Sequence, residues 1–77
     1  DYAWTQARPA SAKPWFYVVV DDPDRTCRAI GTSTLYIGSI GACATWKPQG
    51  CTVYLPANAP DWMVEHEERH CNGWTHD

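Results

Sequence analysis

Cysteine spacing is the feature that most constrains what this chain can fold into. Four cysteines are spread over 77 residues, and none of them forms a C-x-x-C pair. A chain this short buries only about 60% of its unfolded surface, so it usually needs disulfides or a metal besides its hydrophobic core. An even number of cysteines without the spacing of a four-thiolate zinc site favours two disulfides, formed in an oxidising compartment. Three pairings are open among Cys27, Cys43, Cys51 and Cys71.

Charge and hydropathy argue against two classes of partner. The chain has 6 basic and 9 acidic residues, and its basic side chains are scattered singly. It therefore lacks the positive stripe that nucleic-acid binding requires. The longest apolar run, residues 15–20, is far shorter than the roughly 20 residues of a membrane span. The chain begins at Asp1 and does not open with basic residues followed by an apolar segment, as a leader peptide would. We therefore expect the mature form of a secreted or periplasmic protein.

The chain divides into an extended arm, residues 1–14, and a single domain, residues 15–77. The arm contains two prolines and no hydrophobic period, and its Tyr2 and Trp4 either dock on the domain or stay mobile. In the domain, β-branched and aromatic runs separated by glycine and proline predict strands. The predicted strands are residues 15–20, 25–30, 34–37, 42–46 and 51–55. The first of them should be buried on at least one side.

Two turns connect these strands. The run of residues 21–24, Asp-Asp-Pro-Asp, indicates a turn, because it lacks the glycine and distal glutamate of a calcium-binding loop. Residues 47–50 predict the turn of a hairpin whose returning strand is residues 51–55.

Residues 60–72 predict the one helix of the domain. Asn58 can cap it, Pro60 suits its first turn, and Gly73 can leave it with a positive φ. Val64 and Cys71 share an arc that should face the sheet, so Cys71 is expected to be a disulfide partner and not a metal ligand. We therefore predict an α+β fold, with a small antiparallel sheet of three or four strands packed against one C-terminal helix and held by two disulfides.

All three histidines lie in the last twelve residues, HEERHCNGWTHD. On a helix, His66 and His70 lie one above the other and can hold a single metal ion. Glu67 projects about 100° further round, beside the open position of the metal, where it can act as a general base. Gly73 lets the chain turn back so that His76 can supply a third nitrogen. Three imidazoles and a water molecule form a catalytic zinc arrangement.

This segment resembles the zinc signature H-E-x-x-H-x-x-G-x-x-H of the metzincin metalloproteases. Asp77 follows the third histidine, as in the adamalysin-type form of that signature. The resemblance implies that His66, His70 and His76 bind Zn²⁺ and that Glu67 is the catalytic base.

Metzincins continue beyond this signature to a methionine-containing turn and a lower lobe. The chain stops at Asp77, and its one methionine, Met63, precedes the signature, so the resemblance is to a minimal form without either feature. By analogy with the upper half of that family, residues 51–55, or a neighbouring strand edge, should bind extended substrate by strand addition.

Several side chains near the signature have two interpretations each. Tyr54 either stabilises an oxyanion or packs in the domain, and the packing role is more common for a tyrosine in an alternating strand. Trp74 either pins the loop that carries His76 or forms a rim for substrate side chains. Trp62 and Met63 either wall the metal site or fill core space. Tyr54 and Trp74 are the candidate substrate-binding residues.

The leading hypothesis is a small secreted zinc metallopeptidase, a hydrolase acting on a peptide or protein substrate. The alternative is a non-enzymatic, disulfide-stapled module that uses the histidines for structural zinc or for docking a partner. A third hypothesis is a small domain whose histidines have no common role. The presence of Glu67 favours the first, because a purely structural site does not need it.

Overall fold

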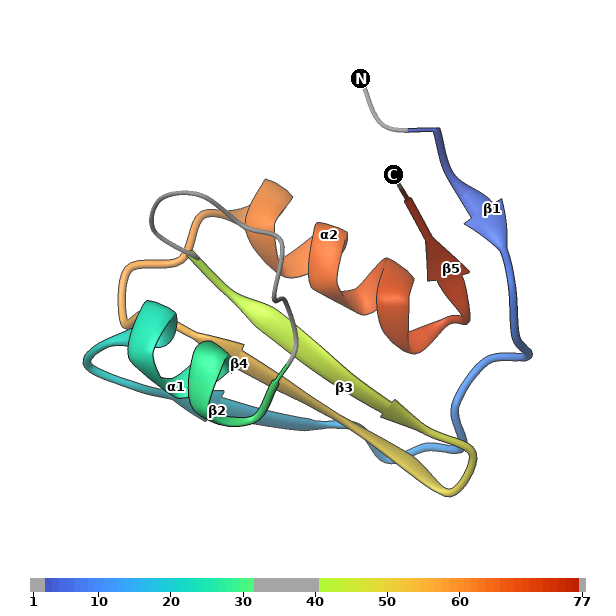
Figure 1. The fold of residues 1–77 in the computed structure, drawn as a ribbon, viewed down its shortest axis with the longest axis horizontal. Coiled ribbons are helices and arrows are strands. Elements are labelled where there is room, and N and C mark those ends of the chain that lie inside the picture. Colours follow the sequence, from blue (N-terminus) through green and yellow to red (C-terminus); the bar gives the residue numbers. More distant parts are fainter. Residues whose placement is uncertain (1–2, 32–40, 77) are drawn as a thin grey trace.

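The computed structural model describes residues 3–31 and 41–76, so the predicted strand at residues 34–37 lies outside the described residues. The described elements form a small α+β fold with two helices and two sheets, which confirms the predicted fold class (Figure 1). In chain order they are β1 (Thr5–Gln6), β2 (Phe16–Val19), α1 (Pro23–Ala29), β3 (Cys43–Lys47), β4 (Gly50–Leu55), α2 (Asp61–Cys71) and β5 (Trp74–Thr75).

The larger sheet has the strand order β2-β4-β3. β3 and β4 form the predicted antiparallel hairpin, in which Lys47 pairs with Gly50. β2 runs parallel to β4, so the prediction of a purely antiparallel sheet is wrong. A parallel pair needs a crossover connection, and between β2 and β4 the chain passes through α1 and β3.

Alternation along β4 gives the sheet two different faces. Cys51, Val53 and Leu55 are buried with Cys71 of α2 in the main core. Tyr54 points to the other face, where it packs against the buried pair Cys27 and Cys43. The side chains of α2 and α1 therefore pack on opposite faces of the sheet.

Residues 25–30 were predicted as a strand, and this prediction is wrong, because they lie in and just after α1. The Asp22 carboxylate accepts a hydrogen bond from the Arg25 backbone N–H at 3.1 Å and so caps the helix. Pro23 stands in the first turn, and Arg28 pairs with Asp24 at 2.9 Å across one turn. These helix-start signals outweigh the β-branched residues of the segment.

Among the described residues, β2 lies at an edge of the sheet, and all four of its side chains are exposed. The prediction that residues 15–20 are buried on at least one side is therefore wrong for β2, although Trp15 just before it packs against the main core. One contact still connects β2 to α2, because the Tyr17 hydroxyl donates a hydrogen bond to Glu68 Oε2 at 2.5 Å. That bond to a carboxylate is the main reason why the pKa of Tyr17 rises to about 12.

Two disulfides are present, as predicted, and the structure decides their pairing. Cys27–Cys43 joins α1 to β3, and Cys51–Cys71 joins β4 to the last residue of α2. The assignment of Cys71 to a disulfide and not to a metal is confirmed. Two disulfides are typical of proteins that fold in an oxidising compartment.

α2 begins at Asp61 and ends at Cys71. The residue at the N-cap position is Pro60, and no side chain caps this end, so the predicted cap by Asn58 is wrong. Gly73 has φ +93°, the left-handed conformation expected where the chain leaves the helix. Within residues 3–31 and 41–76, neither helix has the length and apolar character needed to cross a membrane.

Candidate metal centre

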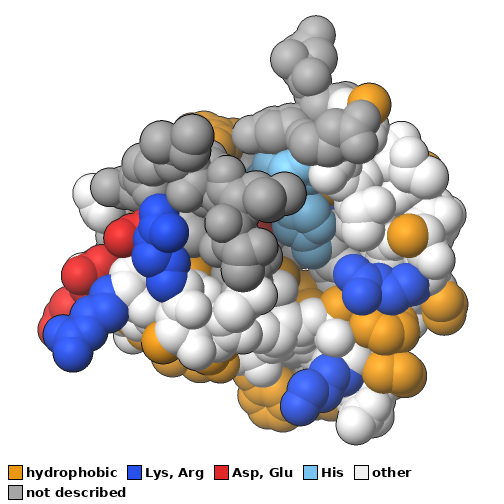
Figure 2. All heavy atoms as spheres, in the orientation of Figure 1, with side chains coloured by type: hydrophobic (Ala, Val, Ile, Leu, Met, Phe, Trp, Pro, Cys, Tyr) orange, Lys and Arg blue, Asp and Glu red, His pale blue; other side chains and the backbone are white. Residues whose placement is uncertain are grey.

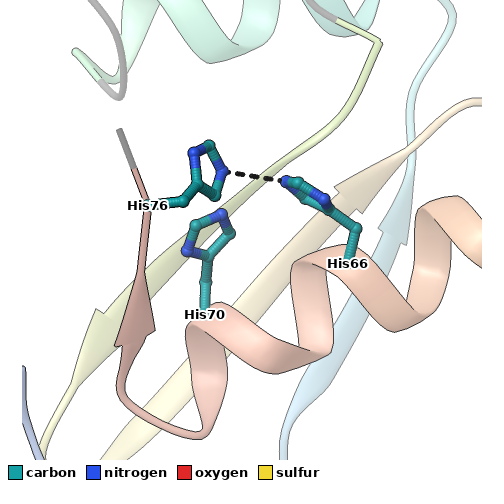
Figure 3. Close-up of side chains that lie close together, drawn as sticks. All are labelled: His66, His70 and His76. Atoms are coloured by element: carbon teal, nitrogen blue, oxygen red, sulfur yellow. Dashed lines mark hydrogen bonds between the residues drawn. The ribbon is translucent and has the colours of Figure 1, made fainter. Parts of the chain in front are cut away.

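The three histidines come together at the C-terminal end of α2 (Figure 3). His66 and His70 lie one turn apart on α2, and His76 follows β5. Their ring centroids are 5.2, 4.9 and 4.9 Å apart, which makes a nearly equilateral triangle. One nitrogen from each ring lies within 4.8 Å of the others, and this group could hold a metal ion. Figure 2 shows histidine side chains in a hollow of one face of the molecule.

The nitrogen positions fit a metal ligand set. His66 Nε2 and His76 Nε2 are 3.1 Å apart. Two nitrogens bound to one tetrahedral zinc ion are roughly 3.3 Å apart, because each lies about 2.0–2.1 Å from the metal. His70 Nδ1 lies 3.0 Å from the Trp74 carbonyl oxygen, so an Nδ1–H donates to that carbonyl and leaves Nε2 with its lone pair.

The surroundings of the cluster favour neutral imidazoles. Burial lowers the pKa of His66 to about 4, with help from His70, His76 and Arg69 as nearby positive charges. Burial also lowers the pKa of His70. Only the neutral ring has a lone pair for a metal, so these two shifts keep the ligands in their binding form at neutral pH.

Glu67 follows the first histidine directly on α2 and is only 7% exposed. Burial raises the pKa of its carboxyl from the ordinary value of 4.5 to about 7. Buried carboxylates with a strongly shifted pKa are concentrated at functional sites. A group with a pKa near 7 can both accept and release a proton at neutral pH.

The N-terminal arm fastens the segment that carries His76. β1 pairs with β5 in antiparallel register. The N–H groups of Ala7 and Arg8 both donate to the Gly73 carbonyl, at 2.9 and 3.2 Å, and the Ser11 N–H donates to the Cys71 carbonyl at 2.8 Å. The arm is thus docked, which decides between the two states that the sequence left open for it.

Trp4 is the residue of the site that sequence reasoning missed. Its ring centroid lies 5.1 Å from that of His66, 5.4 Å from that of His70 and 4.8 Å from that of His76. The Arg69 guanidinium lies over the same indole at 4.8 Å. The sequence signal for it was an aromatic side chain in the N-terminal arm. Tyr2, the other aromatic considered there, lies outside the described residues.

The remaining candidates lie in different places. Tyr54 packs against the Cys27–Cys43 disulfide, on the face of the sheet opposite to α2. Trp74 contributes its backbone carbonyl to His70. Met63 packs against the main core, and Trp62 is 66% exposed.

β4 cannot bind a peptide by strand addition, because it is the central strand of its sheet and both of its edges are paired. That part of the prediction is wrong. β2 and β3 are the edge strands of this sheet among the described residues.

No protein-family model, curated protein or solved structure matches this chain.

Proposed function

We propose that this protein is a secreted or periplasmic zinc metallopeptidase that uses the metzincin-type signature of residues 66–77. One observation carries the proposal. An i, i+4 histidine pair on α2 meets His76, with 3.1 Å between the Nε2 atoms of His66 and His76, and the buried Glu67 stands next in the chain to the first of these ligands.

The donor set supports zinc as the metal. Three neutral imidazoles suit Zn²⁺ and other borderline transition metals far better than Mg²⁺ or Ca²⁺, which prefer oxygen ligands. When bound, zinc would supply an activated water and polarise the carbonyl of the scissile peptide bond. Cys71 is excluded as a fourth ligand because it is in a disulfide.

Glu67 would move the proton in this reaction. Its carboxylate takes a proton from the attacking water and passes it to the leaving amine. A pKa of about 7 suits both transfers near neutral pH. His70 Nδ1 is hydrogen-bonded to the Trp74 carbonyl. This bond fixes the tautomer of His70 and the orientation of its ring for binding a metal.

One observation favours the second candidate function, a non-enzymatic, disulfide-stapled zinc-binding module. Trp4 packs against all three imidazoles. Structural zinc sites are closed, whereas catalytic sites keep an open position. In that role the metal would hold the arm, α2 and β5 together, and a partner protein would dock on the assembled surface.

The deciding experiment compares Glu67→Gln with Glu65→Gln. Both variants remove one carboxylate from α2, but Glu65 is exposed. We expect both to keep about one zinc per chain, measured by elemental mass spectrometry, and His70→Ala to lose it. Cleavage of a peptide library should fall by about 10²–10⁴-fold in Glu67→Gln alone.

Retained cleavage in Glu67→Gln would exclude the role assigned to this residue. Zinc in the wild-type protein without any cleavage would favour the non-enzymatic module.

A further inference from the structure

The four rings of the site form a nearly regular tetrahedron. The three imidazole centroids are 4.9–5.2 Å apart, and the Trp4 centroid is 4.8–5.4 Å from each of them. The point equidistant from all four centroids is thus roughly 3 Å from each. A histidine ring bound through Nε2 places its centroid at about that distance from zinc, since the Zn–N bond is about 2.0–2.1 Å long. The indole therefore lies at the fourth vertex of this tetrahedron. The open coordination position of a metal bound by the three histidines would point toward it.

Arg69 and the cluster hold the indole from two sides. The guanidinium lies 4.8 Å from the Trp4 ring centroid, a cation–π contact, and the imidazoles pack on the ring as described. The hydrogen bonds that fasten the rest of the arm belong to residues 5–12, which bond to β5, to the end of α2, to β3 and to the turn between β3 and β4. All of these residues lie beyond Trp4 in the chain, so the indole can move aside while those bonds stay intact.

We propose that Trp4 is a cap on the metal centre, which controls the access of water, small ligands and peptide to a metal held by the three histidines. This proposal rests on the proposed metal site but not on peptide hydrolysis. It adds a residue from the arm to the site, and it makes displacement of that residue a condition for substrate binding.

The test measures the access of small molecules to the metal in the full-length, zinc-loaded chain. Zinc transfer to a coloured chelator is followed by stopped flow in the wild type, Trp4→Ala, Trp4→Phe and Trp62→Ala. We expect transfer at least 10-fold faster in Trp4→Ala and close to wild type in Trp4→Phe, which keeps an aromatic ring. Trp62→Ala is the matched control, because Trp62 is 66% exposed, and its rate should equal that of the wild type.

A second measurement needs no variant. Azide is titrated into the wild-type protein loaded with Co²⁺, and the visible absorption of the metal is recorded. A capped site should leave the spectrum of the wild-type protein unchanged as azide is added. A wild-type spectrum that responds readily to azide would overturn the cap, even if Trp4→Ala does not fold.

The outcomes separate the two proposals. Zinc binding without peptide cleavage contradicts the hydrolase and leaves the cap standing, because zinc release does not depend on chemistry. Equal release from the wild type and Trp4→Ala, with cleavage intact, overturns the cap alone. A wild-type chain that binds neither Zn²⁺ nor Co²⁺ overturns both.

Discussion

Gly73 serves the site in two ways at the scale of a single residue. Its φ of +93° lets the chain leave α2 and turn toward β5. A Cβ at this position would also lie 1.9 Å from the Arg8 carbonyl oxygen, so the absence of a side chain allows the arm to approach. The same glycine therefore shapes the loop before His76 and makes room for the strand that fastens it.

Gly73→Ala should consequently damage both the fold and the site. A left-handed conformation costs a residue with a Cβ about 1–2 kcal/mol, and the clash with backbone adds to this cost. We expect a loss of more than about 2 kcal/mol in the free energy of unfolding and weaker zinc binding, measured by denaturant titration and metal competition. Gly50→Ala is the control, because no atom lies within 4 Å of the Cβ it would gain. Equal effects of the two substitutions would contradict this account.

At the scale of elements, the two disulfides close loops of similar length but lie in different parts of the fold. Cys51–Cys71 closes a separation of 20 residues and fixes the end of α2 to β4. Cys27–Cys43 closes 16 residues and fixes α1 to β3, on the face of the sheet opposite to α2. Loops of these lengths give each bridge about 3 kcal/mol by the chain-entropy estimate. Their effects on the histidines should nevertheless differ, because only one of them anchors the helix that carries His66 and His70.

We predict that the double substitution Cys51→Ala with Cys71→Ala lowers zinc affinity at least 10-fold more than Cys27→Ala with Cys43→Ala. The loss of global stability should be similar in the two proteins, at about 2–4 kcal/mol each. Competition with a chelator of known affinity measures the first quantity, and denaturant unfolding measures the second. Equal zinc affinities would show that the anchor of α2 does not matter to the site.

At the scale of the whole molecule, two neighbouring residues of α2 make stability depend on pH in opposite directions. The pKa of Glu67 is raised from 4.5 to about 7 in the folded protein. The stability that Glu67 adds to the folded protein is therefore fully present below pH 4.5 and is lost as the pH rises to about 7. The pKa of His66 is lowered from 6.5 to about 4, so stability is lost as the pH falls from 6.5 toward 4.

Glu67→Gln isolates the first of these effects in zinc-free protein. Glutamine cannot ionise, so the variant should gain stability relative to the wild type as the pH rises from 4.5 to about 7. The relative gain should reach up to about 3 kcal/mol above that range. Urea unfolding at a series of pH values, after treatment with a chelator, measures it. Curves that stay parallel across this range would show that burial does not raise the pKa of this carboxyl.

Features that depend on residues close together in the chain could be predicted from the sequence. α2, the hairpin of β3 and β4, and the shared face of His66 and His70 depend on residues within a few positions of one another. α1 also has local signals, namely Pro23 and the surrounding aspartates, which suit the start of a helix.

Long-range contacts could not be predicted in this way. Whether β2 runs parallel to β4, and whether its apolar side chains are covered, depends on where the chain goes after residue 20. Nothing near Tyr17 in the sequence points to its hydrogen bond with Glu68, 51 positions away.

By itself, the sequence determined the spacing of His66, Glu67, His70, Gly73 and His76, because helix periodicity and a positive φ are local properties of the chain. It also determined that Cys71 faces the sheet. Only the tertiary structure decided the disulfide pairing, the burial of Glu67 and the position of Trp4 over the imidazoles. Each of these brings together groups that the chain holds apart, and their energies come from packing and desolvation, which no local pattern specifies.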